Sequence, residues 1–131
     1  MILGVGIDLL DIKRVDRLYS KFKEKFAERI LSKEEFSIFK NYKDKVKFLA
    51  KRFSSKESFS KAVGTGIGRG INFNDISIVP DILGKPILSL SHEASYFLET
   101  IFRKSFDKLK IDLSTTDENG YINTIVLISC L

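Results

Sequence analysis

The chain has 131 residues, of which 44% are hydrophobic and 30% are charged, and its net charge is +5. These values are typical of a soluble globular protein and predict a single domain, residues 1–131, with its own core. No apolar run approaches the roughly 20 residues that a membrane span needs. The positive charge favours an anionic partner, such as a nucleic acid, an acidic protein, a phosphorylated ligand or a membrane surface.

Cysteine usage and the start of the sequence bear on the compartment. Cys130 is the only cysteine, so no internal disulfide can form, and a reducing environment is expected. Residues 1–10 contain Asp8 and lack a basic segment, which is not the pattern of a secretory signal peptide. Together these features predict a cytoplasmic protein.

The stretch from Ile2 to Leu10 has the composition of a buried strand, except for Asp8. A carboxylate in an apolar strand is costly unless it is paired or binds a cation. One interpretation is that Asp8 stands at the strand end and caps the next helix. The other is that Asp8 is a metal ligand and that Glu57 is its companion carboxylate.

A helical pattern begins at Asp11, with apolar residues at steps of three and four. This apolar stripe consists of Ile12, Val15, Tyr19, Phe22, Phe26 and Ile30. A second, basic stripe consists of Arg14, Arg17, Lys21 and Lys25. Such a stripe is usually a solvated face, but arginine pairs well with carboxylates, so docking of an acidic helix is the alternative.

Ser32 and Glu35 form a capping box, which predicts the start of another helix. The segment from Lys43 to Val63 then predicts one long helix. It ends in a loop with glycine at positions 64, 66, 68 and 70. Alternating glycines permit positive φ and let the backbone approach a ligand closely.

The long helix carries one carboxylate among three cations. Arg52 and Lys56 are four residues apart, as are Glu57 and Lys61, and residues with this spacing share a helix face. Glu57 could therefore hold a hard cation while the basic side chains hold phosphates. The structural alternative is that the Glu–Lys pair only stabilises the helix and that Gly64 is only its C-cap.

Known phosphate-binding motifs do not match this loop. The sequence has no Walker A motif, and the glycines follow a helix, whereas those of a dinucleotide fingerprint precede one. Because a helix C-terminus repels anions, phosphate binding here would depend on side-chain cations and loop amides.

The remainder of the chain predicts short strands and one more helix. The strands are expected at Ile76–Val79, Ile87–Leu90, Ile111–Ser114 and Tyr121–Leu131, with a polar turn at Thr115–Gly120. Ser91 caps the helix, and His92, the only histidine, is interpreted as a surface residue in its first turn. The elements do not alternate as βαβ units and the last two strands form a hairpin. The predicted class is therefore α+β, with a small antiparallel sheet packed with several helices.

Three stretches together resemble the holo-[acyl-carrier-protein] synthase family, the small 4′-phosphopantetheinyl transferases. They are GIDLLDIKRV at Gly6–Val15, RFSSKESFSKA at Arg52–Ala62, and the glycine-rich loop at Gly64–Gly70. The turn Gly84-Lys85-Pro86 also fits the family. The resemblance covers essentially the whole chain, and Asp8 with Lys56-Glu57-x-x-x-Lys61 is its specific part.

The resemblance implies the 4′-phosphopantetheinyl transferase fold and its reaction. In that reaction the 4′-phosphopantetheine group moves from coenzyme A to a serine of apo-acyl carrier protein, and adenosine 3′,5′-bisphosphate is released. The family's cofactor is Mg²⁺, and its activity supports fatty acid biosynthesis. The family also forms homotrimers with active sites between neighbouring subunits, which agrees with the very apolar first and last strands. The identity of the general base is left open.

The resemblance also implies roles for individual residues. Asp8 and Glu57 match the Mg²⁺ ligands, and Lys61 matches a lysine near the transferred phosphate, so these three are the expected catalytic residues. Coenzyme A contacts are expected at Arg52, Lys56, Lys61, Gly64, Thr65, Gly66 and the rest of the loop. The carrier protein is expected to bind at Arg14, with Arg17 and Lys21 beside it.

One position departs from the family, in which many members carry a histidine just before the Ser/Thr-rich segment of the penultimate strand. Here Asp112 stands in that place, with its role left open, and His92 is not positioned to replace the histidine. A nucleic-acid-binding module is the rival from another class. It is disfavoured by the lack of tryptophan and of aromatics interleaved with basic residues. A non-catalytic partner of an acidic protein is a further alternative.

Overall fold

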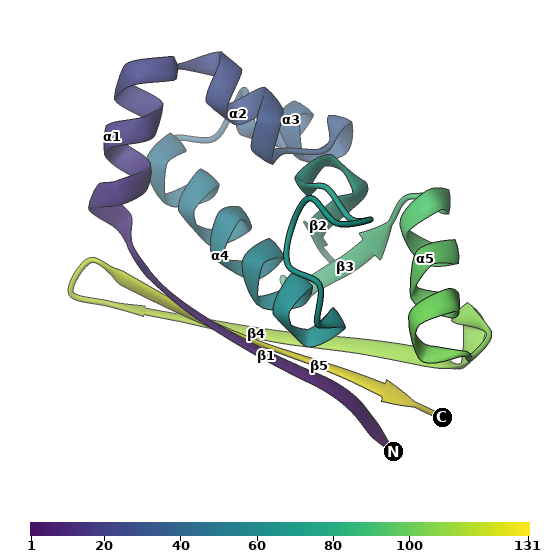
Figure 1. Cartoon of the computed structure of the whole chain (residues 1–131). Coiled ribbons are helices and arrows are strands. Elements are labelled where there is room, and N and C mark those ends of the chain that lie inside the picture. Colours follow the sequence, from purple (N-terminus) through teal and green to yellow (C-terminus); the bar gives the residue numbers. More distant parts are fainter.

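The computed structural model describes all 131 residues, and Figure 1 shows its longest helix lying across a three-stranded sheet. The elements are β1 (Ile2–Asp11), α1 (Ile12–Phe22), α2 (Glu24–Ile30), α3 (Lys33–Phe39), α4 (Lys45–Val63), β2 (Ile76–Pro80), β3 (Pro86–Leu90), α5 (His92–Phe102), β4 (Leu109–Glu118) and β5 (Tyr121–Cys130). The sheet is antiparallel with strand order β1-β5-β4, and β2 and β3 form a separate hairpin. The predicted α+β class is confirmed.

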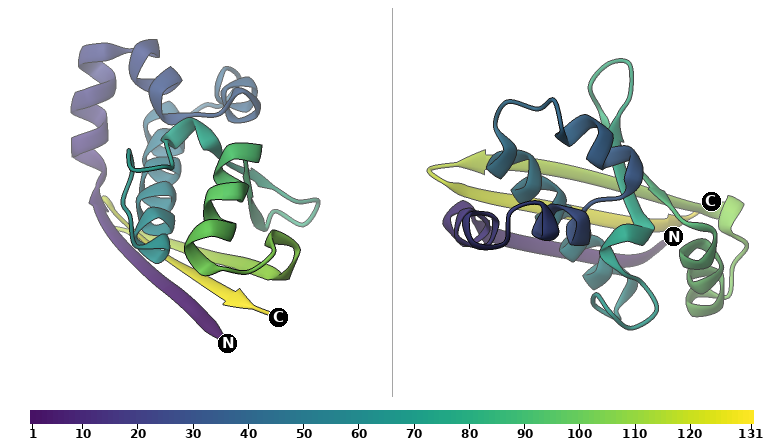
Figure 2. Two further views of the ribbon diagram at one scale, coloured as in Figure 1. Left: turned by 45° about the vertical axis from the view of Figure 1, so that its right-hand side comes forward. Right: turned by 90° about the horizontal axis from the view of Figure 1, so that it is seen from above.

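Helix α4 is the central element. One side packs on β1 and β5, helices α1–α3 cover its first half, and the β2–β3 hairpin and α5 lie near its end (Figure 1). The hairpin projects from the body of the molecule (Figure 2). The chain termini lie together, since the amide of Cys130 donates to the carbonyl of Met1 at 2.8 Å. No helix combines the length and the apolar character that crossing a membrane requires.

Strand β1 lies close to α4 because two of its residues are glycine. A Cβ on Gly4 would lie 2.0 Å from the carbonyl oxygen of Ala62, and one on Gly6 would lie 1.9 Å from that of Ser58. Neither position accommodates a side chain. Alternate residues of a strand point to the same side, so this close approach brings Asp8 against α4.

Gly6→Ala is expected to lower the free energy of unfolding by about 1–3 kcal/mol, the usual cost of overpacking a core. The new methyl group would push β1 away from α4 and carry Asp8 with it. Urea unfolding measures the effect. The control is Ile82→Ala, at a side chain that is 99% exposed in the β2–β3 turn. A Gly6→Ala midpoint equal to that of the wild type would contradict the close packing.

The expectation of one continuous helix along the apolar stripe from Ile12 to Ile30 is wrong. The chain breaks at Lys23, whose φ is 52°, and α2 begins at Glu24. The break turns α2 so that three of its residues, Phe26, Ala27 and Ile30, are buried, whereas α1 buries only Val15. No glycine or proline marks this break, so the sequence pattern continues through it.

Strand β4 is longer than the sequence predicts, and the turn expected at Thr115–Gly120 is correspondingly shorter. Pairing with β5 continues to Glu118, which stands opposite Tyr121. Only Asn119 and Gly120 remain in the turn, with φ of 52° and 81°. Two consecutive positive φ values are typical of a tight two-residue hairpin turn.

Candidate active site

Asp8 lies where β1 crosses α4, and its side chain is 14% exposed. Ser54 Oγ donates a hydrogen bond to its Oδ2 at 2.9 Å, and Lys61 Nζ lies 3.4 Å from its Oδ1. The next helix is capped by Asp11, whose carboxylate accepts from the amide of Lys13 at 3.0 Å. Asp8 is therefore not a cap, and its role as a metal ligand stays a prediction.

Glu57 faces the same place from α4. Burial raises its pKa, and the negative charge of Asp8 raises it further, whereas Lys61 and Arg14 lower it. None of the ion pairs in the structure involves Glu57. Two carboxylates that repel each other, one without a protein partner, favour a bound cation.

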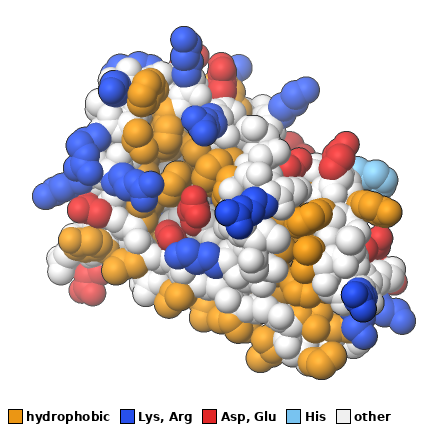
Figure 3. Space-filling view, in the orientation of Figure 1, with side chains coloured by type: hydrophobic (Ala, Val, Ile, Leu, Met, Phe, Trp, Pro, Cys, Tyr) orange, Lys and Arg blue, Asp and Glu red, His pale blue; other side chains and the backbone are white.

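Lys61 lies one turn after Glu57, with its side chain 52% exposed. Its Nζ donates to the carbonyl of Ile7 at 3.0 Å as well as facing Asp8. The structure thus brings Asp8, Glu57 and Lys61 together. In Figure 3, acidic side chains flanked by basic ones lie near the middle of the face where β1 meets α4.

The glycine-rich loop starts directly at the end of α4. Gly64 is the left-handed C-cap with φ of 96°, and space is open around the Cβ positions of Gly64, Gly66 and Gly68. The amides of Gly64 and Gly66 both donate to the carbonyl of Ser60. These amides are therefore engaged within the protein, while those of Thr65 and Ile67 have no backbone acceptor.

Arg52 lines a pocket of about 570 Å³ on the side of α4 that faces the β2–β3 hairpin. Its guanidinium lies 3.9 Å from the centre of the Phe48 ring, and its Nη2 donates to the carbonyl of Ile78 at 3.1 Å. Basic and hydroxyl side chains share the pocket, namely Lys51, Lys85, Ser55, Ser114 and Thr115. This lining suits a phosphate, because arginine binds phosphate through several N–H groups at once. Arg52 Nε also lies 3.6 Å from Glu35, and Asp8, Glu57 and Lys61 do not line this pocket.

The structure contradicts the expected contact of Lys56 with coenzyme A. Lys56 is fully buried, and its Nζ donates to the carbonyls of Ile30 at 2.7 Å and Phe73 at 3.0 Å and to the carboxylate of Glu35. An ammonium has three hydrogens, and all three are used. Glu35 also accepts from the amides of Ser32 and Ile78. Lys56 and Glu35 therefore join the helices to the hairpin and lie away from any ligand.

Arg14 stands beside the carboxylates, above the ring of Phe53 at 5.3 Å from its centre. With Glu57 it lines a pocket of about 490 Å³. Other residues of this pocket are Leu18, Phe22, Lys25, Phe26, Arg29, Ile30 and Phe73. Arg17 and Lys21 are exposed on the same helix but do not line it. Basic side chains over α1 and α2 are visible in Figure 3 and surround a partly apolar floor.

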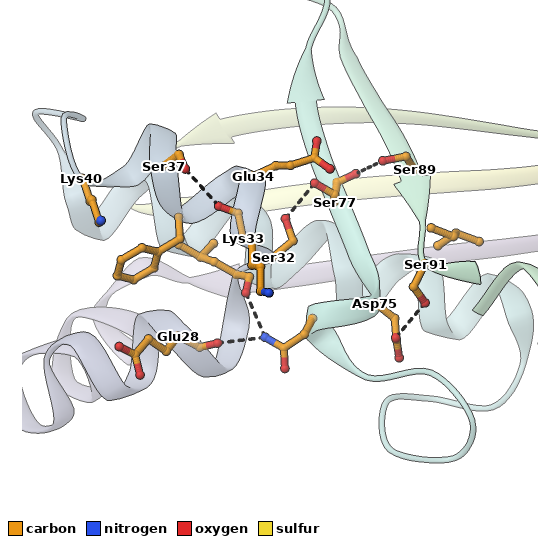
Figure 4. Close-up of a pocket in the computed structure, with 14 residues that line it drawn as sticks. Glu28, Ser32, Lys33, Glu34, Ser37, Lys40, Asp75, Ser77, Ser89 and Ser91 are labelled. Carbon is orange, nitrogen blue, oxygen red and sulfur yellow. Dashed lines mark hydrogen bonds between the residues drawn. The ribbon is translucent and has the colours of Figure 1, made fainter. Parts of the chain in front are cut away.

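The largest pocket, about 720 Å³, lies elsewhere, between α3 and the β2–β3 hairpin (Figure 4). Its serines are already bonded: Ser32 Oγ and Ser77 Oγ are 2.8 Å apart, and Ser91 Oγ donates to Asp75 at 2.8 Å. None of the three residues grouped at Asp8 lines it. Its volume does not make it the reaction site.

Two residues considered from the sequence lie apart from these groups. Asp112 on β4 forms an exposed ion pair with Lys110 at 3.5 Å and does not line the pocket of Arg52. His92 is the exposed first residue of α5. Conversely, sequence reasoning missed Ser54 and Thr124, two fully buried residues bonded near Asp8. The available signal for Ser54 was a run of serines on a long buried helix.

Comparisons with known proteins identify the family of the chain. A model of the 4′-phosphopantetheinyl transferase superfamily matches residues 4–120. The chain belongs to this superfamily, and it is a phosphopantetheinyl transferase enzyme.

More specific likeness comes from the holo-[acyl-carrier-protein] synthases. The one from Blochmanniella pennsylvanica is 41% identical over 128 residues, which cover 98% of both chains. The crystal structure of the enzyme from Neisseria meningitidis matches with a TM-score of 0.88 and 39% identity, over 98% of this chain and 99% of the other. The Helicobacter pylori enzyme, solved in complex with coenzyme A, matches with a TM-score of 0.79 and 31% identity over 95% and 99%.

Proposed function

We propose that this chain transfers the 4′-phosphopantetheine group of coenzyme A to a serine of apo-acyl carrier protein, with Mg²⁺ as cofactor. The observation that carries the proposal is the meeting of Asp8 and Glu57 beside Lys61 and the glycine-rich loop. Holo-[acyl-carrier-protein] synthases similar along the whole chain support the same reaction.

The two carboxylates fit the proposed cation. No group of three or more His, Cys, Asp or Glu residues could hold a metal in this structure. Mg²⁺, however, typically takes one or two protein carboxylates and completes its shell with water and substrate phosphate oxygens. Asp8 and Glu57 would hold it, and it would supply positive charge to the pyrophosphate of coenzyme A.

The remaining residues supply position and charge. The carrier serine loses its hydroxyl proton to solvent, and its oxygen forms a bond to the phosphorus attached to pantetheine. The bond from that phosphorus to the bridging oxygen breaks, and adenosine 3′,5′-bisphosphate leaves with that oxygen. Lys61, half exposed next to Asp8, stabilises the leaving phosphate. The amides of Thr65 and Ile67 are proposed to hold coenzyme A beside the carboxylates. Arg52 is proposed to hold a phosphate of coenzyme A in a separate pocket, which Asp8, Glu57 and Lys61 do not line. Such preorganised charge and orientation supply most of the rate enhancement in phosphoryl transfer.

The carrier protein is proposed to dock on α1 and α2. Arg14 joins the basic stripe to Glu57, and it shares an apolar-floored pocket with Lys25 and Arg29. Arg17 and Lys21 extend the positive surface towards solvent. An acidic helix presenting an apolar side chain fits this combination, because arginine pairs with carboxylates around an apolar contact.

A homotrimer is proposed for the assembly. The outer side of β1 exposes Val5, Ile7 and Leu9, at 55%, 57% and 68%, and Ile125 of the neighbouring β5 adds to them. Figure 3 shows hydrophobic side chains along the edge of the molecule formed by the sheet. A contiguous exposed apolar surface of this kind marks a protein–protein contact. A role in fatty acid biosynthesis and a cytoplasmic location complete the proposal.

The test is to incubate the purified chain with coenzyme A, Mg²⁺ and an apo-acyl carrier protein and to weigh the carrier by mass spectrometry. The carrier is expected to gain the mass of one phosphopantetheine group. Asp8→Ala, Glu57→Ala and EDTA are each expected to prevent the gain, because each removes the cation or its ligands. A carrier that binds tightly without gaining mass would contradict the transferase and favour a non-catalytic binding module.

A further inference from the structure

A buried chain of two hydroxyl groups connects Asp8 to the central strand β5, on the side of the sheet that faces α4. Ser54 on α4 places its Oγ 2.9 Å from Asp8 Oδ2 and 3.1 Å from Thr124 Oγ1. Thr124 belongs to β5 and stands directly opposite Asp8 of β1 in the antiparallel register. Ser54 and Thr124 are both 0% exposed, so water does not replace these bonds.

The hydrogens of this chain have only one consistent arrangement. A serine hydroxyl has a single hydrogen, and an ionised carboxylate only accepts. Ser54 therefore donates to Asp8, and Thr124 must donate to Ser54. Both hydroxyls point their hydrogens towards Asp8, and this order strengthens the bond to the carboxylate.

We infer that Ser54 is a positioning residue for Asp8, that Thr124 orients Ser54, and that the two together decide which oxygen Asp8 offers to the cation. Oδ2 is committed to Ser54, whereas Oδ1 faces Lys61 on the open side of the site. Ligands that are themselves held by hydrogen bonds bind metals more tightly, and removing such a support typically costs about 10–100-fold in affinity. The inference rests on the proposed function, because it takes Asp8 as a ligand of the cation.

Ser54→Ala is the direct test, with Mn²⁺ as the probe cation in the presence of coenzyme A. Titration followed by the electron paramagnetic resonance signal of free Mn²⁺ gives the affinity. Ser54→Ala is expected to weaken Mn²⁺ binding about 10–100-fold. Thr124→Val, which removes only the second hydroxyl, is expected to weaken it less, and Thr124→Ser, which keeps the hydroxyl, is expected to restore it.

Ser58→Ala is the matched control for lost packing and stability. Ser58 lies one turn further along α4 and is equally buried, but its single hydroxyl hydrogen is shared between the carbonyls of Gly6 and Thr124, and it makes no hydrogen bond to Asp8. It should keep the Mn²⁺ affinity of the wild type even where it lowers the unfolding midpoint. Equal Mn²⁺ affinity in Ser54→Ala and the wild type, or equal losses in Ser54→Ala and Ser58→Ala, would overturn the positioning role.

Asp8→Asn separates this inference from the proposed function. If the wild type binds Mn²⁺ and Asp8→Asn does not, the cation site stands, and the serine variants then decide the inference alone. If Asp8→Asn binds Mn²⁺ as the wild type does, the assignment of Asp8 fails, and the positioning role of Ser54 fails with it.

Discussion

Glu57→Gln is expected to slow phosphopantetheine transfer by about 100-fold or more, because removing even one preorganised charge-stabilising group costs about 10²–10³ in rate. Glutamine keeps the size of the side chain but has no negative charge with which to hold a cation beside Asp8. The rate should be measured over a range of Mg²⁺ concentrations, so that a lost affinity is distinguished from a lost maximal rate. Glu93→Gln, on the exposed first turn of α5, is the matched control and should retain full activity.

The same substitution is expected to make the metal-free protein more stable. Burial and the charge of Asp8 both raise the pKa of Glu57, so the folded chain holds a carboxylate where negative charge is unfavourable. Glutamine removes that charge without leaving a partner behind, since no ion pair involves Glu57. Thermal unfolding in EDTA should show a higher midpoint for Glu57→Gln than for the wild type. A fully active variant, or a less stable one, would contradict a cation site at this place.

Local sequence patterns predicted most elements, because their signals lie within a few residues. The capping box at Ser32 and Glu35 and the cap at Ser91 are both present in the structure. The break at Lys23 was missed because nothing local to it interrupts the apolar stripe. It is imposed by packing of α2 against the rest of the core, which only the folded chain defines.

The candidate site was predictable in part for a chemical reason. A carboxylate in an apolar strand needs a partner, and this requirement led from Asp8 to Glu57 across the sequence. The hydroxyl chain through Ser54 to Thr124 gave no comparable signal. It depends on the register between β1 and β5 and on the close approach of α4 that Gly4 and Gly6 permit.

The burial of Lys56 could not be predicted from its spacing along the helix. Its distance from Arg52 places both on one side of a helix, but spacing does not say how deeply that side is buried. The answer depends on Glu35, which comes from another helix and accepts a hydrogen bond from Lys56. Arg52 remains 14% exposed and reaches its pocket, while the shorter-reaching ammonium of Lys56 is enclosed.

Lys56→Met is expected to lower the free energy of unfolding by about 3–5 kcal/mol, the usual cost of removing one partner from a buried ion pair. Methionine has a similar volume but leaves Glu35 charged and 0% exposed, with only backbone amides and the more distant Arg52 near it. It also leaves the carbonyls of Ile30 and Phe73 without the donor they have now.

Lys47→Met is the matched control for this substitution, in the same helix. Lys47 lies 2.9 Å from Asp117, but the two side chains are 43% and 33% exposed, so water screens the pair. Its removal should leave the free energy of unfolding nearly unchanged. Urea unfolding of both variants measures the difference. Equal losses in the free energy of unfolding would show that water screens the ion pair of Lys56 and Glu35 as it does that of Lys47 and Asp117.

Glu35→Gln tests the same pair from its other side and adds a dependence on pH. Burial lowers the pKa of Lys56 to about 8, although Glu35 raises it, so loss of the carboxylate lowers this pKa further. Between the lowered pKa and the ordinary value of 10.5, the unfolded chain holds a proton that the folded chain has lost, and stability rises with pH. Glu35→Gln should have a lower free energy of unfolding than the wild type. This difference should shrink as the pH rises towards 8 and stay constant above it. A deficit that does not change with pH would mean that Lys56 keeps its proton without Glu35, and that the carbonyls of Ile30 and Phe73 alone hold the ammonium.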